Sequence, residues 1–273
     1  MPDLPLPQLQ DASLTLEERV AILTLQRDDV RNALTGTALV SDIVTTIQWA
    51  NRYEAVSVLI LTGAGSAFSA GGNIKEMRDR TGTFGGTVLD IQRQYRQGIQ
   101  NMPLALHSAE IPLIAAVNGP AVGAGCDLSC MCDIRIGSTK AVLGETFINL
   151  GIIPGDGGAW FLQRLLGYQR AAELTLIGRL VKAAEAKEMG LLLEVVEPDE
   201  LLPRAKALAA DIAAKPPQTV RFTKRLLKLA QRMELPDFLD LCACFQGMCH
   251  HTEDHSEALN AFLEKRAGNY KGK

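Results

Sequence analysis

The sequence predicts an α/β protein that ends in a helical C-terminal region. Three observations lead to this fold class: apolar, β-branched runs recur along the first two thirds of the chain, glycine-rich turns follow them, and long helical patterns fill the rest. Apolar runs bounded by glycine are typical of strands buried in parallel sheets, whereas apolar residues every three to four positions are typical of helices. Alternation of the two indicates a sheet covered by helices.

The first predicted elements are a strand and a helix. The segment VAILTLQR, residues 20–27, alternates apolar and polar positions, as strands do. The DDVRNALT that follows indicates a turn leading into a helix over residues 35–52. A second apolar run, AVSVLILTG, ends at Gly63 and predicts a buried strand, and the loop AGSAFSAGGNIKEM comes directly after it.

A second strand, turn and helix follow a segment without periodicity. Residues 79–86, DRTGTFGG, have no apolar period and are rich in Gly and Thr, which predicts a mobile lid. The next stretch, VLDIQRQYRQGIQNMPLALHS, has a helical pattern. PLIAAVNGPAVGAGCDLSCMCDIRIGS then predicts an apolar strand, a glycine-rich turn, a helix of small residues and another short strand.

The chain changes character after Gly190. The patterns there are long, helical and charged on one face, and we find no convincing strand among them. We therefore predict a core over residues 1–199 and a helical C-terminal region over residues 200–273.

Composition narrows the possible functions. A chain of 273 residues with 47% hydrophobic content can bury a full core. The net charge of −3 provides no basic field, so we expect no nucleic-acid partner. No apolar stretch is long enough for a membrane helix and the start lacks the features of a signal peptide, so we expect no membrane partner and a cytoplasmic location. The six cysteines lie within apolar helical patterns, which predicts reduced, buried thiols.

Two glycine-rich turns predict a site. FSAGGNI, around Gly71 and Gly72, and GPAVGAGCD, around Gly123 and Gly125, each lie between a strand and a helix. Small residues let a ligand approach the main chain, and a helix N-terminus has unpaired N–H donors. Two such turns facing each other would form an oxyanion hole, a pair of backbone N–H groups that stabilises developing negative charge. The alternative interpretation is that the two turns only connect strands to helices in an α/β fold and bind no ligand.

Five segments carry a resemblance to a known family. AFSAGGNIKEM, IPLIAAVNGPAVGAGCDL, MCDIRI, LGIIPGDGG and HSEALNAFLEKR resemble, in order and separation, the signature blocks of the enoyl-CoA hydratase/isomerase (crotonase) superfamily, over residues 16–266. The resemblance implies a crotonase-like ββα spiral core of two sheets with an acyl-CoA pocket, and a helical C-terminal trimerisation region. It also implies a lyase or isomerase of fatty acid metabolism, assembled as a homotrimer or a dimer of trimers. Coenzyme A would be part of the substrate, with no separate cofactor.

The motifs of the family also imply particular site residues. The oxyanion-hole N–H groups are expected at Gly72 and Ala124. The coenzyme A strip and the acyl pocket imply these substrate-binding residues: Arg31, Ala33, Ala70, Gly71, Ile74, Gly123, Phe147, Ile148, Phe262 and Lys265. For Arg31 the alternative is a solvated charge, and for the last two it is an ordinary amphipathic helix.

The chain departs from a standard hydratase at both catalytic positions. Hydratases of this family add water with two glutamates, and here Asp127 stands at the first position and Phe147 at the second. Asp127 is the best candidate acid or base, although its side chain is one methylene shorter. Glu145 shares a face with Phe147 if the segment is extended, but the sequence does not place it at the substrate.

A second candidate carboxylate is Asp156, in the segment PGDGG. Asp127 and Asp156 would divide into a neutral acid and an ionised base if the apolar pocket around Phe147 and Ile148 shifts one of the two pKa values. The alternative interpretation is that Asp156 caps the helix that follows it.

The missing glutamates leave other reactions open. Hydration or double-bond isomerisation of an enoyl-CoA is the nominal reaction, and a decarboxylase or a thioester hydrolase in the same pocket is the alternative. A protein that binds acyl-CoA without catalysis is a hypothesis from a different class. An RNA-binding role, known for some relatives, is disfavoured by the acidic balance.

Two cysteine-containing segments are interpreted as packing rather than chemistry. Residues 242–255, CACFQGMCHHTEDH, contain metal-ligand residue types but lack paired CxxC motifs, so we expect no metal site. We expect instead a cysteine-lined helix face and Thr252 as the N-cap of the last helix. Cys126 follows the second glycine turn without a histidine close in sequence to activate it.

Overall fold

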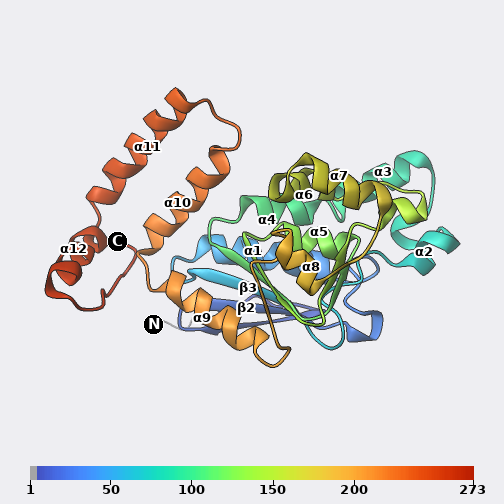
Figure 1. Cartoon of the computed structure of the whole chain (residues 1–273), viewed down its shortest axis with the longest axis horizontal. Coiled ribbons are helices and arrows are strands. Elements are labelled where there is room, and N and C mark those ends of the chain that lie inside the picture. Colours follow the sequence, from blue (N-terminus) through green and yellow to red (C-terminus); the bar gives the residue numbers. More distant parts are fainter. Residues whose placement is uncertain (1–4) are drawn as a thin grey trace.

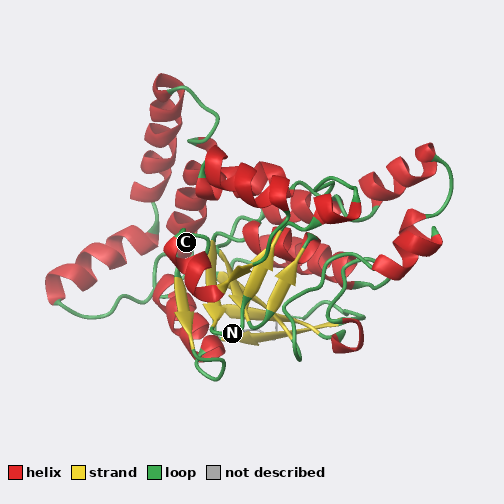
Figure 2. Ribbon diagram, turned by 45° about the vertical axis from the view of Figure 1, so that its right-hand side comes forward, coloured by secondary structure: helices red, strands yellow, loops and turns green. Residues whose placement is uncertain are grey.

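The computed structural model of the chain describes residues 5–273 and contains two β-sheets (Figures 1 and 2). The larger sheet has the strand order β1-β2-β3-β4-β6-β9, and the smaller sheet has the order β5-β7-β8. Strands β1 and β2 pair antiparallel, and each other neighbouring pair of the larger sheet is parallel. The strands are β1 (Ala12–Glu17), β2 (Val20–Leu25), β3 (Val58–Gly63), β4 (Leu113–Val117), β5 (Pro120–Val122), β6 (Ile134–Ser138), β7 (Val142–Gly144), β8 (Val181–Lys182) and β9 (Glu194–Val196).

Helices cover both faces of the larger sheet and continue beyond it. The helices are α1 (Leu39–Arg52), α2 (Ile74–Asp79), α3 (Val88–Gln97), α4 (Asn101–Ser108), α5 (Ala124–Cys130), α6 (Gly158–Leu166), α7 (Tyr168–Ile177), α8 (Ala183–Glu188), α9 (Leu201–Ala213), α10 (Pro217–Leu229), α11 (Leu235–His250) and α12 (Glu253–Glu264). Short 3-10 helices span Asp28–Val30, Gly82–Phe84 and Phe147–Leu150. No helix within residues 5–273 combines the length and the apolar character needed to cross a bilayer.

Side-chain alternation along β2 explains why its sequence is apolar on both faces. Ala21 and Leu23 pack into the main core with the helices on one side of the sheet. Val20 and Ile22 face the other side, where they join a second buried cluster with Leu201 of α9. Successive side chains of a strand point to opposite faces, so a sheet covered on both sides requires a nearly continuous apolar run. The run VLILTG of β3 follows the same rule.

The strongly patterned elements are confirmed, and two strands correct the sequence-based prediction. The predicted helix over residues 35–52 is α1, which begins at Leu39. The prediction of no strand after Gly190 is wrong, because β9 pairs with β6 in parallel. Strand β1 was not predicted either. Strand β9 has three residues, which is too short for a period to be detected.

The C-terminal helices lie at different distances from the sheet. Helix α9 covers the sheet, α10 is hydrogen-bonded to the body through Arg221 and Lys224, and α11 and α12 lie farther out (Figure 1). The predicted division after residue 199 falls just before α9 and stays a prediction. Thr252 caps α12 by accepting a hydrogen bond from the His255 N–H at 3.0 Å, as predicted. The prediction that the cysteines are buried is wrong for Cys244, which is exposed.

Candidate functional site

The two glycine-rich turns lie against each other. Ser69 and Ala121 form a parallel β-bridge, and the Val122 N–H donates to the Ser69 carbonyl at 3.0 Å. Gly71 has a φ of +77°, and a Cβ atom there would lie 2.5 Å from the Val122 carbonyl oxygen and 2.9 Å from the Ala124 nitrogen. This backbone contact therefore requires glycine. The two turns are therefore in direct backbone contact.

Gly72 and Ala124 both line one small cavity. Ala124 is the first residue of α5, where a helical N–H has no partner within the helix. The N–H of Gly71 donates to Ser69 Oγ and that of Asn73 donates to Thr35 Oγ1, and within residues 5–273 the Gly72 N–H between them has no acceptor. Two free donors at one cavity are the parts of an oxyanion hole.

Apolar side chains close this cavity to about 30 Å³, which is room for about one water molecule. Its wall includes Met77, Phe84, Tyr95 and Ile152. The same four side chains line an adjoining outer depression of about 660 Å³. They therefore separate the inner cavity from the outer one. Phe84 belongs to the segment 79–86 that was predicted to be a lid, and the mobility of this segment stays a prediction.

The two predicted carboxylates occupy different positions relative to the cavity. Asp156 lines it, whereas Asp127 does not and is fully buried behind it. The Asp127 carboxyl packs on Gly158, where a Cβ atom would lie 2.2 Å from a carboxyl oxygen. The alternative role of Asp156 as a helix cap is wrong, because Gly157 occupies the N-cap of α6 and no side chain bonds to its free N–H groups.

Burial and mutual contact set the protonation of these two groups. Burial raises the pKa of Asp127 well above its usual value, and the charges of Asp156 and Glu145 raise it further. Burial also raises the pKa of Asp156, but the hydrogen bond from Asp127 lowers it. No basic side chain within residues 5–273 forms an ion pair with either group. These effects favour a protonated Asp127 beside an ionised Asp156.

A third buried acid, Glu145, belongs to the same cluster. Its side chain lies within hydrogen-bonding contact of Asp127, and Thr175 Oγ1 donates to its Oε2 at 2.6 Å. The sequence placed Glu145 on the face of Phe147 but did not show which groups it reaches. One feature of the sequence points to this residue: Glu145 is an acidic residue within the apolar segment VLGETF, two positions before Phe147.

The predicted coenzyme A strip is brought together, although the structure contains no ligand. Ala33 and Gly71 form a parallel β-bridge, and the Ala70 N–H donates to the Arg31 carbonyl at 2.8 Å. The side chains of Arg31 and Ile74 are exposed beside this strip.

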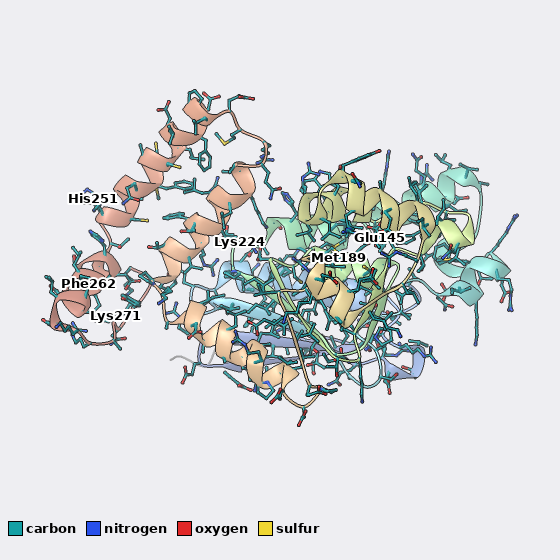
Figure 3. The ribbon with its side chains drawn as sticks, viewed as in Figure 1. Glu145, Met189, Lys224, His251, Phe262 and Lys271 are labelled. Carbon is teal, nitrogen blue, oxygen red and sulfur yellow. The ribbon has the colours of Figure 1, made fainter. Side chains whose placement is uncertain are left out.

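The acyl-pocket candidates are only partly together. The Phe147 ring lines the cavity and lies 3.8 Å from the position of a Cβ atom on Gly123, whereas Ile148 is largely exposed. Phe262 and Lys265 are not at this cavity. Phe262 lies on α12, at the far end of the molecule from Glu145 (Figure 3), and its side chain is 82% exposed.

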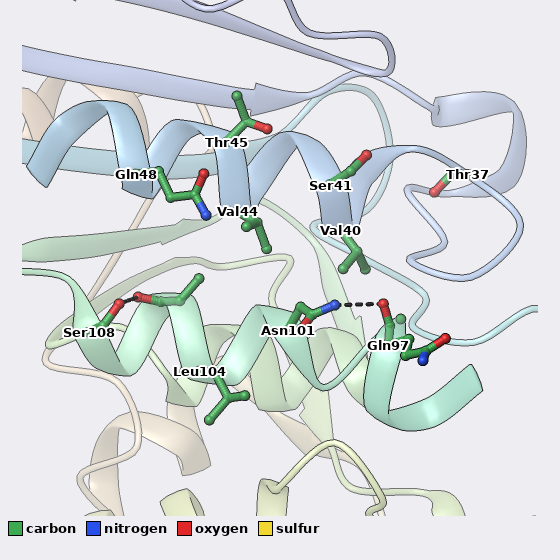
Figure 4. Close-up of a pocket in the computed structure, with 12 residues that line it drawn as sticks. Thr37, Val40, Ser41, Val44, Thr45, Gln48, Gln97, Asn101, Leu104 and Ser108 are labelled. Carbon is green, nitrogen blue, oxygen red and sulfur yellow. Dashed lines mark hydrogen bonds between the residues drawn. The ribbon is translucent and has the colours of Figure 1, made fainter. Parts of the chain in front are cut away.

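A larger groove elsewhere lacks these chemical groups. It lies between α1 and α4, has a volume of about 710 Å³, and is lined by Val40, Val44 and Leu104 among others (Figure 4). None of the predicted site residues lines it. The small cavity is therefore the candidate site, because donors and a carboxyl converge there.

Comparison with known proteins agrees with the motifs and the fold. The family model described as "Enoyl-CoA hydratase/isomerase" matches residues 15–273. Crotonyl-CoA hydratase from Syntrophomonas wolfei is 35% identical, with 94% of this chain and 96% of the relative covered. Short-chain-enoyl-CoA hydratase from Clostridium acetobutylicum is 36% identical, with 95% and 97% covered. The crystal structure of an enoyl-CoA hydratase from Bacillus anthracis superposes with a TM-score of 0.90 at 35% identity, covering 97% of this chain and all of that one. The chain belongs to the enoyl-CoA hydratase/isomerase family.

Proposed function

We propose that this family member is an enzyme that moves the double bond of a 3-enoyl-CoA thioester into conjugation with the carbonyl. One observation carries the choice of reaction: Asp156 is the one carboxylic acid among the described residues that line the cavity, and the phenyl ring of Phe147, which cannot transfer a proton, lines it too. A single carboxylate can remove a proton and return it elsewhere, as isomerisation requires. Hydration requires one group to activate water and another to deliver the proton.

The proposed reaction proceeds through an enolate. The Asp156 carboxylate removes a proton from the carbon next to the thioester carbonyl, and the electron pair moves onto the carbonyl oxygen. The N–H groups of Gly72 and Ala124 stabilise the negative charge that develops there. The protonated Asp156 then returns the proton to the γ-carbon as the electron pair shifts back, which leaves the 2-enoyl thioester. Asp127 assists as a positioning residue, because it donates a hydrogen bond to Asp156 from behind the cavity.

Hydration of a short enoyl-CoA is the second candidate reaction. The names of the relatives support it, since two of them at 35% and 36% identity are hydratases of crotonyl-CoA and of short-chain enoyl-CoA. Supplying 3-enoyl-CoA and crotonyl-CoA separately distinguishes the two reactions. Conjugated thioester absorbance rises during isomerisation and falls during hydration. Turnover of crotonyl-CoA alone would contradict the isomerase assignment, and turnover of neither would favour another thioester reaction or a binding protein.

We expect Phe147→Glu to increase hydration of crotonyl-CoA by about tenfold or more, because it adds a second acid–base group to the cavity wall. The control is Phe147→Gln, which has the same length and polarity but cannot exchange a proton at neutral pH. Initial rates of crotonyl-CoA loss measure the effect. Equal rates for the two variants would show that position 147 does not reach the reacting atoms.

We also propose that the chain forms a homotrimer or a dimer of trimers through its C-terminal helices. These helices expose apolar side chains that a monomer would leave in water: Leu235, Leu239, Met248, Leu259, Phe262 and Leu263. Sedimentation velocity of the full chain is expected to show three or six copies per particle, and a monomer at micromolar concentration would contradict the proposal. The cytoplasmic location stays a prediction.

A further inference from the structure

The cluster behind the cavity contains three carboxyl groups in a row. Asp156 lines the cavity, Asp127 interacts with Asp156, and Glu145 interacts with Asp127. Their side chains are between 0% and 3% exposed. Apart from the Thr175 hydroxyl, which donates to Glu145 Oε2, no donor within residues 5–273 outside the cluster bonds to any of the side-chain oxygens.

Such a row cannot be fully ionised near neutral pH. Like charges in contact inside a protein repel strongly, so the group that interacts with both of the others is the one expected to retain a proton. Asp127 is in the central position and contacts both neighbours. Its proton is therefore held by the charges on either side. Burial raises the pKa of Glu145, and the hydrogen bond from Thr175 opposes this rise and favours the charged carboxylate.

Other titratable groups near the row come from three elements. Cys126 and Cys130 lie on α5 with Asp127, Arg135 of β6 acts on Cys130, and Tyr95 of α3 is close to Asp156. Of these, Cys130 is a thiol whose pKa is lowered, chiefly by its hydrogen bond with Cys126. It could also give a pH-dependent signal, and a control variant must separate it from Asp127.

We propose that Glu145, held by Thr175, is a positioning residue that keeps the proton on Asp127 and thereby keeps Asp127 a hydrogen-bond donor to the catalytic Asp156. This inference rests on the proposed function of Asp156 and extends it to a residue that does not touch the cavity. It requires that the charge of Glu145, rather than its shape, matters. Glutamate and glutamine have nearly the same shape, so replacing Glu145 by glutamine tests the effect of the charge alone.

The sign of the effect follows from the charges. When Asp127 loses its proton, an enolate must form beside adjacent carboxylates, so turnover falls at high pH. Glu145→Gln removes one negative charge from the row, and the remaining proton is then lost more easily. The alkaline limb of kcat/KM is expected to move to lower pH by about one unit or more. The acid limb, which reports the ionisation of Asp156 itself, is expected to move less.

Thr175→Val is expected to move the same limb in the same direction as Glu145→Gln, by a smaller amount. Without the hydroxyl, Glu145 is less readily ionised and its charge holds the proton on Asp127 less strongly, so the alkaline limb is expected to fall by less than about one pH unit. Thr175→Ser keeps the donor and is expected to match the wild type. Cys130→Ala measures the contribution of the thiol, whose charge also raises the pKa of Asp127, and the shift in Glu145→Gln is expected to exceed it.

A measurement without substrate separates this inference from the proposed function. The infrared C=O band of protonated carboxyls is followed against pH in the wild type and in each variant, and Asp127→Asn identifies the part of the band that belongs to Asp127. The midpoint of that band is expected to fall in Glu145→Gln and, by less, in Thr175→Val, whether or not any thioester turns over. Absence of turnover by the wild type with these shifts intact would contradict only the proposed function. Unchanged midpoints in both variants, with Asp156 still required for turnover, would overturn the role of Glu145 alone.

Discussion

Replacing Asp156 by asparagine is expected to lower kcat for enoyl-CoA isomerisation by about 10³-fold. Asparagine keeps the size of the side chain but cannot accept the substrate proton. Because Asp156 is the one carboxylic acid lining the cavity among the described residues, no neighbouring group there can replace it as the base. Stopped-flow or steady-state absorbance of the conjugated thioester measures the loss.

Controls must show that the loss is chemical rather than structural. The variant removes a charge from a buried cluster of like charges, so its free energy of unfolding in urea is expected to equal or exceed that of the wild type. KM is expected to change little, since the carboxylate acts in the chemical step. Asp199→Asn, which changes an exposed carboxylate, is the matched control. Retention of more than about a tenth of wild-type kcat in Asp156→Asn would exclude Asp156 as the base.

Replacing Ala124 by proline is expected to lower kcat/KM by about 10²-fold to 10³-fold, because it deletes one of the two oxyanion-hole N–H groups. The first position of a helix tolerates proline, whose missing N–H has no partner within the helix there. Ala124 occupies this position in α5, so the helix should form in the variant. The same absorbance assay measures the change.

The matched variant for this experiment is Ala124→Gly, which keeps the N–H and removes only a methyl group. It is expected to retain activity within a few-fold of the wild type, since the backbone rather than the side chain contacts the carbonyl oxygen. Circular dichroism confirms that both variants fold. Equal activity of the proline and glycine variants would contradict the assignment of the oxyanion hole to this N–H.

Periodicity determined most of the fold because the patterned elements are long or fully buried. Strand β3 is an unbroken apolar run, and helix α1 presents its apolar stripe to the core. Strand β1 had a usable signal, since Ala12, Leu14 and Leu16 alternate with polar residues, but the prediction began one strand later. Strand β9 had no such sequence signal. Its three residues form a strand only because they pair with β6 at the edge of the sheet.

By itself the sequence determined the family, the glycine-rich turns, and Gly72 and Ala124 as candidate donors. These features depend on short motifs, in which the chain conformation follows from neighbouring residues. The tertiary structure decided which carboxyl faces the cavity. Asp127 and Asp156 belong to different elements, and only the packing of α5 against Gly158 places the first behind the second. Glu145 entered the cluster for the same reason, since spacing along a chain carries no information on which buried side chains meet across elements.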